Sequence, residues 1–326
     1  MSFKWFSRSG GSRWLLAAAL TGAGLLASCG GGGQVEPFAP TRLLAFGDEL
    51  STIEADGRKY TINAFRQVTV GGVATDDPTA LDCARNPLWI QTVATNFGLP
   101  LDRCLGTATT AAGQVLARPG HKVADLAAQI AAVQGGALGA KDLALVMIGA
   151  NDILELYASY PTTGRDALLA EARVRGNALG TAINQLATSG PAVVVLTVPD
   201  IGLSPFALAQ NTSSGDATRS KLISELVATF NNRMSVTLIN DGRLIGLVYA
   251  DNEVQNSVKL PASYGLTNVV AAACRATAVL PACTPATLVD GANATGWLWA
   301  DALWLSPAGQ SRLGALADAR ARGNPF

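Results

Sequence analysis

The sequence predicts an α/β protein whose centre is a parallel sheet. From about Thr41 onward, short apolar segments alternate with longer segments of helical periodicity, as in parallel α/β proteins. The segments at 143–148 ("LALVMI") and 192–198 ("AVVVLTV") contain no charged residue, which is typical of strands covered by helices on both faces. We find no internal repeat and no interdomain linker, so we expect a single domain over residues 41–326.

Four strands and five helices are expected in order along this domain. The strands are expected at 43–46, 143–148, 192–198 and 244–249, and the helices at 88–97, 123–133, 165–187, 216–240 and 307–319. The last helix should begin sharply, because Ser306 suits an N-cap and Pro307 suits the first helical position. Asp56 and Gly57 predict the turn of a surface hairpin that extends to Phe65.

Composition excludes nucleic acid as a partner. The 326 residues are 49% hydrophobic and only 15% charged, which suits a large core. Lys and Arg together number 24, as do Asp and Glu, so no basic surface is available for a phosphate backbone. The chain has one histidine, His121, and it is therefore the only imidazole available for acid–base chemistry near neutral pH.

Residues 1–28 resemble a bacterial lipoprotein signal peptide. Basic residues precede an apolar segment at 14–27 that is too short for a comfortable membrane span. The letters "LASC" then resemble a lipobox, in which Cys29 is lipidated and becomes the mature N-terminus. The Gly-rich residues 29–40 would form a flexible tether. Because no aspartate follows Cys29, we expect an outer-membrane lipoprotein of the cell envelope that faces the periplasm or the cell surface. The alternative is an ordinary signal peptide with a chance cysteine.

The other four cysteines are expected to form two disulfides in an oxidising compartment. Of the three connectivities, the local pairing is favoured because each pair lies within a loop-like segment; the pairs are Cys83 with Cys104 and Cys274 with Cys283. The sequence has no Cys-x-x-Cys motif and no His–Cys cluster, so we expect neither a zinc site nor another metal or cofactor.

Four segments in order resemble the conserved blocks of GDSL-type SGNH hydrolases. They are "FGDELS" at 46–51, "ARPGHKVADLAAQI" at 117–130, "GANDIL" at 149–154 and "WADALWLSPAGQ" at 299–310. A fifth, "PASYGLTN" at 261–268, resembles a segment of lipase-like secreted members. The resemblance implies a flavodoxin-like three-layer sandwich. No G-x-S-x-G sequence occurs, which argues against the α/β-hydrolase class.

The resemblance also implies ester hydrolysis by a serine nucleophile, an oxyanion hole and an Asp-x-x-His motif. The glycine and asparagine of the hole correspond to Gly120 and Asn151, and the aspartate corresponds to Asp301. The serine position holds Glu49, and the histidine position holds Trp304. The two residues that would form the covalent bond and move the proton are therefore replaced.

Other residues near the nucleophile position could replace the missing catalytic groups. Ser51 lies two residues after the nucleophile position, although its side chain should not share the direction of Glu49. Glu49 and His121 could together activate a water molecule. A tryptophan has no base function, and we expect Trp304 to pack in the core, with an apolar wall at the site as the alternative.

The replacement of serine by glutamate predicts a specific contact. The carboxylate of Glu49 should accept hydrogen bonds from the Asn151 amide and the Gly120 N–H, and so fill the oxyanion hole. The sequence therefore predicts a lipid-anchored SGNH-like protein without hydrolytic activity, with an acyl, ester or glycan ligand in the remaining cleft. The alternatives are an active carboxylesterase built around Glu49 and His121, and an envelope interaction protein.

Overall fold

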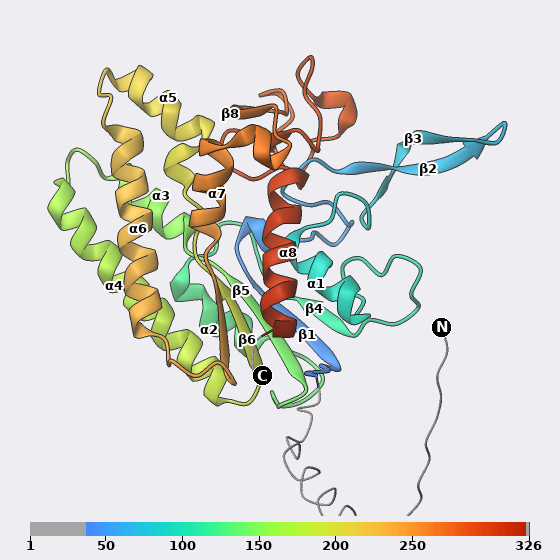
Figure 1. The fold of residues 1–326 in the computed structure, drawn as a ribbon, viewed down its shortest axis with the longest axis horizontal. Coiled ribbons are helices and arrows are strands. Elements are labelled where there is room, and N and C mark those ends of the chain that lie inside the picture. The colour runs from blue at the N-terminus through green and yellow to red at the C-terminus, as the bar shows by residue number, and fades with distance from the viewer. Residues whose placement is uncertain (1–36, 324–325) are drawn as a thin grey trace, which may run out of the picture. The chain divides into compact units, whose positions relative to one another are not determined.

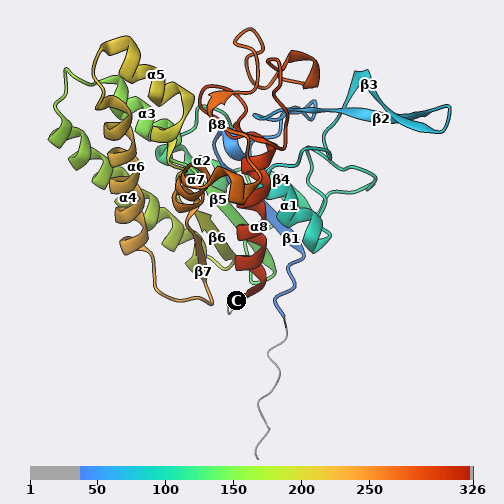
Figure 2. The ribbon, with the colours of Figure 1, turned by 45° about the horizontal axis from the view of Figure 1, so that its top comes forward.

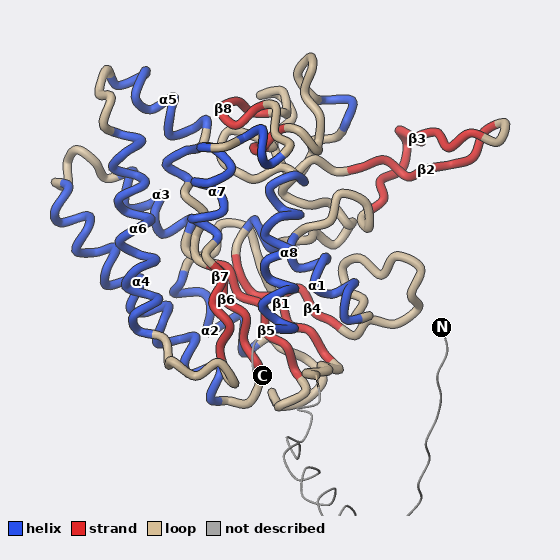
Figure 3. Tube along the Cα trace, in the orientation of Figure 1, coloured by secondary structure: helices blue, strands red, loops and turns tan. Residues whose placement is uncertain are grey.

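A five-stranded parallel sheet lies at the centre of the computed structural model (Figure 1, Figure 3). The structure describes residues 37–323 and residue 326. Its sheet has the strand order β4 (Gly113–Val115), β1 (Arg42–Gly47), β5 (Asp142–Met147), β6 (Ala192–Leu196) and β7 (Ile245–Val248). All neighbouring strands in it run parallel. The expected signal peptide and Cys29 lie outside the described residues.

Helices cover both faces of this sheet, as the apolar strands predict. Helices α2 (Leu126–Ala131), α4 (Arg165–Thr188) and α6 (Arg219–Thr237) pack on one face, and α1 (Trp89–Phe97) and α8 (Pro307–Gly323) pack on the other. The side chains of β5 and β6 are accordingly buried at every position. The predicted α/β fold with a parallel sheet is confirmed. Among the described residues, no helix combines the length and the apolar character needed to cross a bilayer.

The expected strands and helices are all present, with some different boundaries. The helix expected at 216–240 begins only at Arg219, because Asp216 accepts hydrogen bonds from the N–H and hydroxyl of Thr218 and closes a separate turn. Ser306 accepts from the N–H of Ala308 at the start of α8, as expected of a cap. Elements that the sequence analysis did not predict are the edge strand β4, α3 (Ala150–Ala158), α5 (Pro205–Ser214), α7 (Ala250–Lys259), β2 (Ala64–Val70), β3 (Val73–Asp82), β8 (Asn268–Ala272) and β9 (Trp297–Trp299).

Strands β2 and β3 form a hairpin that projects from the sheet (Figure 2). Gly71 and Gly72 connect them, and both have positive φ angles, of 58° and 83°. Such angles suit a two-residue hairpin turn, in which glycine carries no steric cost. The sequence analysis placed a hairpin earlier, at Asp56, and overlooked this one.

The segment predicted as a surface hairpin is in fact largely buried. A turn does form at Asp56 and Gly57, closed by a bridge between Ile53 and Lys59. Lys59, however, is fully buried. Its ammonium group donates to the backbone carbonyls of three residues, at 2.6–2.8 Å; they are Cys83, Arg85 and Asn86. A polar residue is tolerated here because all three of its N–H groups have acceptors, and this is why the prediction of a surface segment was wrong.

The two disulfides pair as predicted, Cys83 with Cys104 and Cys274 with Cys283. The first joins the end of the β2–β3 hairpin region to the loop before β4, and it lies next to the three carbonyls that bind Lys59. Lys59 and the disulfide of Cys83 with Cys104 therefore both fix the segment that connects β3 to α1.

Lys59→Met should lower the free energy of unfolding by about 2–3 kcal/mol, because three buried carbonyls lose a charged donor. Urea unfolding followed by circular dichroism measures the change. Arg58→Met is the matched control, since Arg58 pairs with Asp56 on the surface, and such pairs contribute at most about 1 kcal/mol. Equal losses in the two variants would contradict a special role for Lys59.

Candidate functional site

The end of β1 places Glu49 at the carboxyl edge of the sheet. Gly47 has a φ angle of 150°, and a Cβ atom there would lie 2.2 Å from the carbonyl oxygen of Met147 in β5. Only glycine allows this close approach. Asp48 then caps a short 3-10 helix at Glu49–Ser51, with its carboxylate accepting from the Leu50 N–H. The turn directs the Glu49 side chain toward the ends of β4 and β5.

Both oxygens of the Glu49 carboxylate accept hydrogen bonds. Oε1 accepts from the backbone N–H of Gly120 at 2.9 Å, and Oε2 accepts from Nδ2 of Asn151 at 2.8 Å. The residue is only 8% exposed, and hydrogen bonds to an ionised group are the stronger kind. The predicted contact is therefore present, and we call these three residues the Glu49 site.

Asn151 belongs to α3, which begins directly after β5. Its Nδ2 also donates to the backbone carbonyl of His121, at 3.1 Å. The neighbouring Asp152 accepts from the N–H of Val123 at 2.9 Å. Two successive residues of α3 thus bind the loop that carries Gly120, so the spacing between the two donors of the Glu49 site is fixed.

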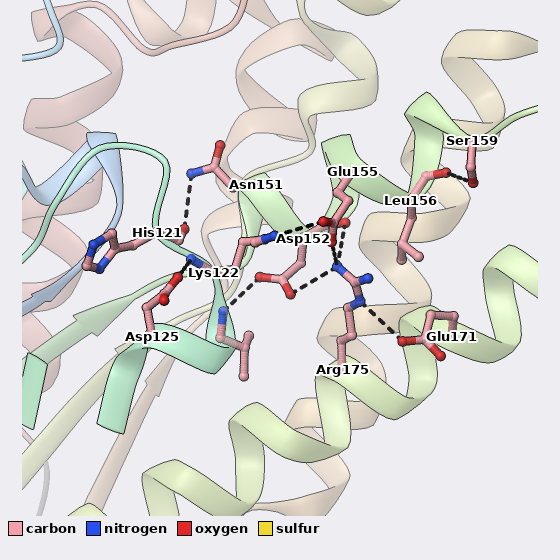
Figure 4. A network of polar contacts seen from close by, with 11 residues as sticks. His121, Lys122, Asp125, Asn151, Asp152, Glu155, Leu156, Ser159, Glu171 and Arg175 are labelled. Atoms are coloured by element: carbon pink, nitrogen blue, oxygen red, sulfur yellow. Dashed lines mark hydrogen bonds and ion pairs between the residues drawn. The ribbon is translucent and has the colours of Figure 1, made fainter. Parts of the chain in front are cut away.

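A network of charged side chains supports this attachment (Figure 4). Arg175 reaches from α4 and bonds Asp152, at 3.4 Å, and Glu155. Lys122, which follows His121 in the loop, bonds Glu155 from the other side at 2.7 Å. Burial raises the pKa of Asp152, while the Val123 N–H and Arg175 act in the opposite direction. The sequence analysis missed Arg175, because nothing in a single sequence relates α4 to this loop.

The ring of His121 is held by Gln129 rather than by Glu49. The Gln129 amide accepts from the Gly47 N–H and donates to the Gly47 carbonyl, which fixes its orientation. Its Nε2 lies 2.8 Å from Nδ1 of His121. Because that amide nitrogen is a donor, Nδ1 accepts, and the neutral ring carries its proton on Nε2. The lone pair that a general base needs is thus already engaged.

Ser51 is fully buried, and its Oγ accepts from the indole N–H of Trp89 at 3.1 Å. As expected, its side chain does not share the direction of Glu49. An ester substrate has no access to this hydroxyl group.

The C-terminal motif has become a turn stabilised by its own aspartate. One oxygen of Asp301 accepts from the N–H groups of Leu303 and Trp304, at 2.8 and 2.7 Å. Burial raises the pKa of Asp301, and these N–H groups act against the rise. Trp304 is 7% exposed and packs in the hydrophobic core, which agrees with the expected core role.

Two further acidic groups and a tyrosine surround Glu49. Asp48 is buried, and burial together with repulsion from Glu49 raises its pKa well above the usual range. The Tyr60 hydroxyl donates to Glu54 at 3.1 Å. Burial, that bond and the negative charges of Glu54 and Glu49 raise the pKa of Tyr60 to about 12. The sequence analysis did not assign Glu54 or Tyr60 to the site.

The chemistry that this arrangement favours is the binding of a negative charge, and Glu49 itself supplies that charge. Its carboxylate occupies both donors, the His121 lone pair points to Gln129, and Asp301 has no imidazole partner. Among the described residues, no group of three or more His, Cys, Asp or Glu side chains could hold a metal ion.

The sequence of the chain matches a known protein family. A family model described as GDSL-like lipase/acylhydrolase matches residues 43–316, a range that includes every residue of the Glu49 site and both Asp301 and Trp304. Among solved structures, Axe2, an acetylxylan esterase from Geobacillus stearothermophilus, is similar, with 17% sequence identity and a TM-score of 0.38 over 88% of this chain and 96% of that chain. No curated protein matches the chain.

Glu49→Gln should lower the free energy of unfolding by about 1–3 kcal/mol. The glutamine can accept only one of the two hydrogen bonds, and its NH2 group would face a second donor. Thermal and urea unfolding measure the effect. Glu54→Gln is the matched control, because glutamine can still accept from Tyr60, and it should change stability by less than about 0.5 kcal/mol. If Glu49→Gln is as stable as the control, the two hydrogen bonds do not contribute as described.

Proposed function

The chain belongs to the GDSL-like lipase/acylhydrolase family, and from that premise we propose that it is a lipid-anchored envelope protein that no longer hydrolyses esters. The observation that carries the proposal is the occupancy of both oxyanion-hole donors by the Glu49 carboxylate. In an esterase these donors stabilise the charge that develops on the substrate carbonyl oxygen. Here a permanent charge of the protein takes that place.

The contacts of the remaining polar groups support the same proposal. An ester hydrolysed through Glu49 and His121 needs a water molecule polarised by a free base. Glu49 is engaged by two donors, and Nδ1 of His121 is engaged by Gln129. A direct attack by the Glu49 carboxylate would form an anhydride and would still need an acid for the leaving group. The described residues around Glu49 offer no imidazole for that step other than His121.

The proposed occupancy of the oxyanion hole by Glu49 also limits which ligands the cleft beside it can bind. An acyl or ester group would bind through its carbonyl oxygen, and that oxygen needs the donors that Glu49 already occupies. A glycan does not depend on an oxyanion hole, because its hydroxyl groups both donate and accept. Of the ligands expected from the sequence, a glycan is therefore the one that Glu49 excludes least.

A short-chain chromogenic ester tests the loss of activity. Wild-type turnover should equal that of Glu49→Ala, and both should equal the uncatalysed rate. Glu49→Ser/Trp304→His should gain at least about 100-fold, since a positioned base contributes that much or more, whereas Trp304→His alone should gain nothing. Circular dichroism checks that the core tolerates the histidine. Wild-type turnover that disappears in Glu49→Ala or His121→Ala would overturn the proposal.

Substitution of the lipobox cysteine tests the anchor. Wild-type protein should sediment with membranes and incorporate radiolabelled palmitate, whereas Cys29→Ser should do neither, because the lipid is its only proposed membrane attachment. Ser28→Ala keeps the cysteine and should behave like wild type. Absence of label and of sedimentation in the wild type would show that the segment is an ordinary signal peptide, and label incorporated by Cys29→Ser would contradict lipidation at Cys29.

A further inference from the structure

A second candidate site lies along the outer edge of β7, and two strands, β5 and β6, separate it from β1 and the Glu49 site. A cavity of about 900 Å³ follows this edge, with α6 and the loop after it as one wall and the beginning of α7 and Arg320 of α8 as the other. We call it the β7-edge cavity. Its volume is within the range of ligand sites in proteins.

Backbone groups of β7 form the floor of this cavity. The N–H groups of Val193 in β6 and of Thr197, which follows β6, donate to the carbonyls of Leu244 and Val248. In a parallel ladder the backbone groups of alternate residues point to opposite sides, so those of Leu247 point away from β6 and into the cavity. Within residues 37–323, neither the N–H nor the C=O of Leu247 has a hydrogen-bond partner.

The opposite edge of the sheet is closed, which shows that the fold does not require an open edge. In β4, the outward N–H and C=O of Gly113 bond Pro100 and Asp102. The outward N–H of Val115 bonds the Asp102 carboxylate, and its C=O accepts from Arg118. Proteins generally protect strand edges in this way. At β7, by contrast, the outward N–H and C=O of Leu247 bond no other described residue.

Polar but mostly uncharged side chains surround Leu247. Asn232 of α6 and Asn252 of α7 line the cavity, and their amide groups bond no other described residue. Tyr249 at the end of β7 is 50% exposed and presents an aromatic ring. The charged Asp251 is already bonded by the Thr197 hydroxyl at 2.7 Å. The cavity therefore offers several neutral donors and acceptors together with one aromatic surface.

We infer that the β7-edge cavity binds a neutral polyhydroxylated ligand, an oligosaccharide segment. Hydroxyl groups can both donate to and accept from amides and backbone groups, and the apolar face of a sugar ring suits the exposed ring of Tyr249. A cationic ligand fits less well, because Asp241 is paired with Arg243 and Asp251 accepts from the Thr197 hydroxyl. Arg320 alone offers an anion one charged contact among mainly neutral groups.

An extended peptide added as a further strand fits less well too. Such a strand needs a series of free donors and acceptors along the edge. The Ile245 N–H, however, donates to the carbonyl of Asp241, and the Tyr249 carbonyl accepts from the Glu253 N–H. Among the described residues of this edge, Leu247 alone has both its N–H and its C=O available. A single residue cannot form the ladder of hydrogen bonds that an added strand needs.

Titration calorimetry of the full chain with neutral hexasaccharides tests the inference. The probes are cellohexaose, xylohexaose, maltohexaose and chitohexaose. At least one should bind with a Kd of about 1 mM or tighter. Tyr249→Ala and Asn252→Ala should each weaken that binding about 5- to 10-fold. Amide hydrogen exchange of Leu247 should slow at saturation, because the ligand bonds that N–H.

Asn256→Ala is the matched control, because Asn256 is exposed one turn further along α7 and does not line the cavity; it should leave the Kd unchanged. Failure of all four sugars to bind at about 10 mM would overturn the inference. It would also be overturned if binding is insensitive to Tyr249→Ala, or if a Thr-Val octapeptide binds at Leu247 in place of the sugars. Sugar binding that responds to Glu49→Ala and not to Tyr249→Ala would place the ligand at the Glu49 site and overturn the inference; the ester assay is read separately, so either result leaves the proposed loss of ester hydrolysis to its own test.

Discussion

The pair of hydrogen bonds to the Glu49 carboxylate joins three parts of the chain that are distant in sequence. Glu49 follows β1, Gly120 follows β4, and Asn151 begins α3 after β5. In a parallel sheet the carboxyl ends of neighbouring strands meet at one edge, so the fold brings the donors together whatever residue stands at position 49. An empty pair of donors would bind water or a passing anion. A glutamate side chain reaches the same place and supplies a charge that cannot leave.

Groups at the beginning of α3 favour the negative charge of the two adjacent carboxyl groups in the turn, Asp48 and Glu49. The backbone N–H groups of Gly149 and Ala150 lower the pKa of Asp48, and Glu49 accepts from the side chain of Asn151. Backbone N–H groups at the start of a helix favour negative charge. They oppose the cost of burial and the mutual repulsion that raise the pKa of Asp48. Glu49 thus places a second carboxyl group beside Asp48, at a point where the beginning of α3 favours negative charge.

The sequence was sufficient for four of the five strands of the sheet, for the disulfides and for the Glu49 contact, because each depends on a local pattern or on ordered motifs. The edge strand β4 is only three residues long and carries no such pattern. Apolar runs identify β5 and β6, and the positions of Gly120 and Asn151 in their motifs predict the donors. The sequence was not sufficient to predict that Lys59 is buried or that Gln129 contacts His121. Both are polar groups whose burial depends on partners supplied by other segments, and a single sequence carries no signal of such pairing. The hairpin of β2 and β3 did have a local signal, two glycines between apolar residues, which the sequence analysis overlooked.

The Glu49 site and the β7-edge cavity lie on different parts of the sheet. The carboxyl end of β1, where open α/β sheets usually bind ligands, is filled by a charge of the protein itself. The free edge of β7 has unused backbone and amide groups, although the edge at β4 shows that this chain can close an edge with Asp102 and Arg118. Two intervening strands separate these places, and effects of distant, independent sites add without coupling. Occupancy of the donors at the first site therefore places no restriction on the second, and the polar groups at β7 remain exposed whatever residue binds Gly120 and Asn151.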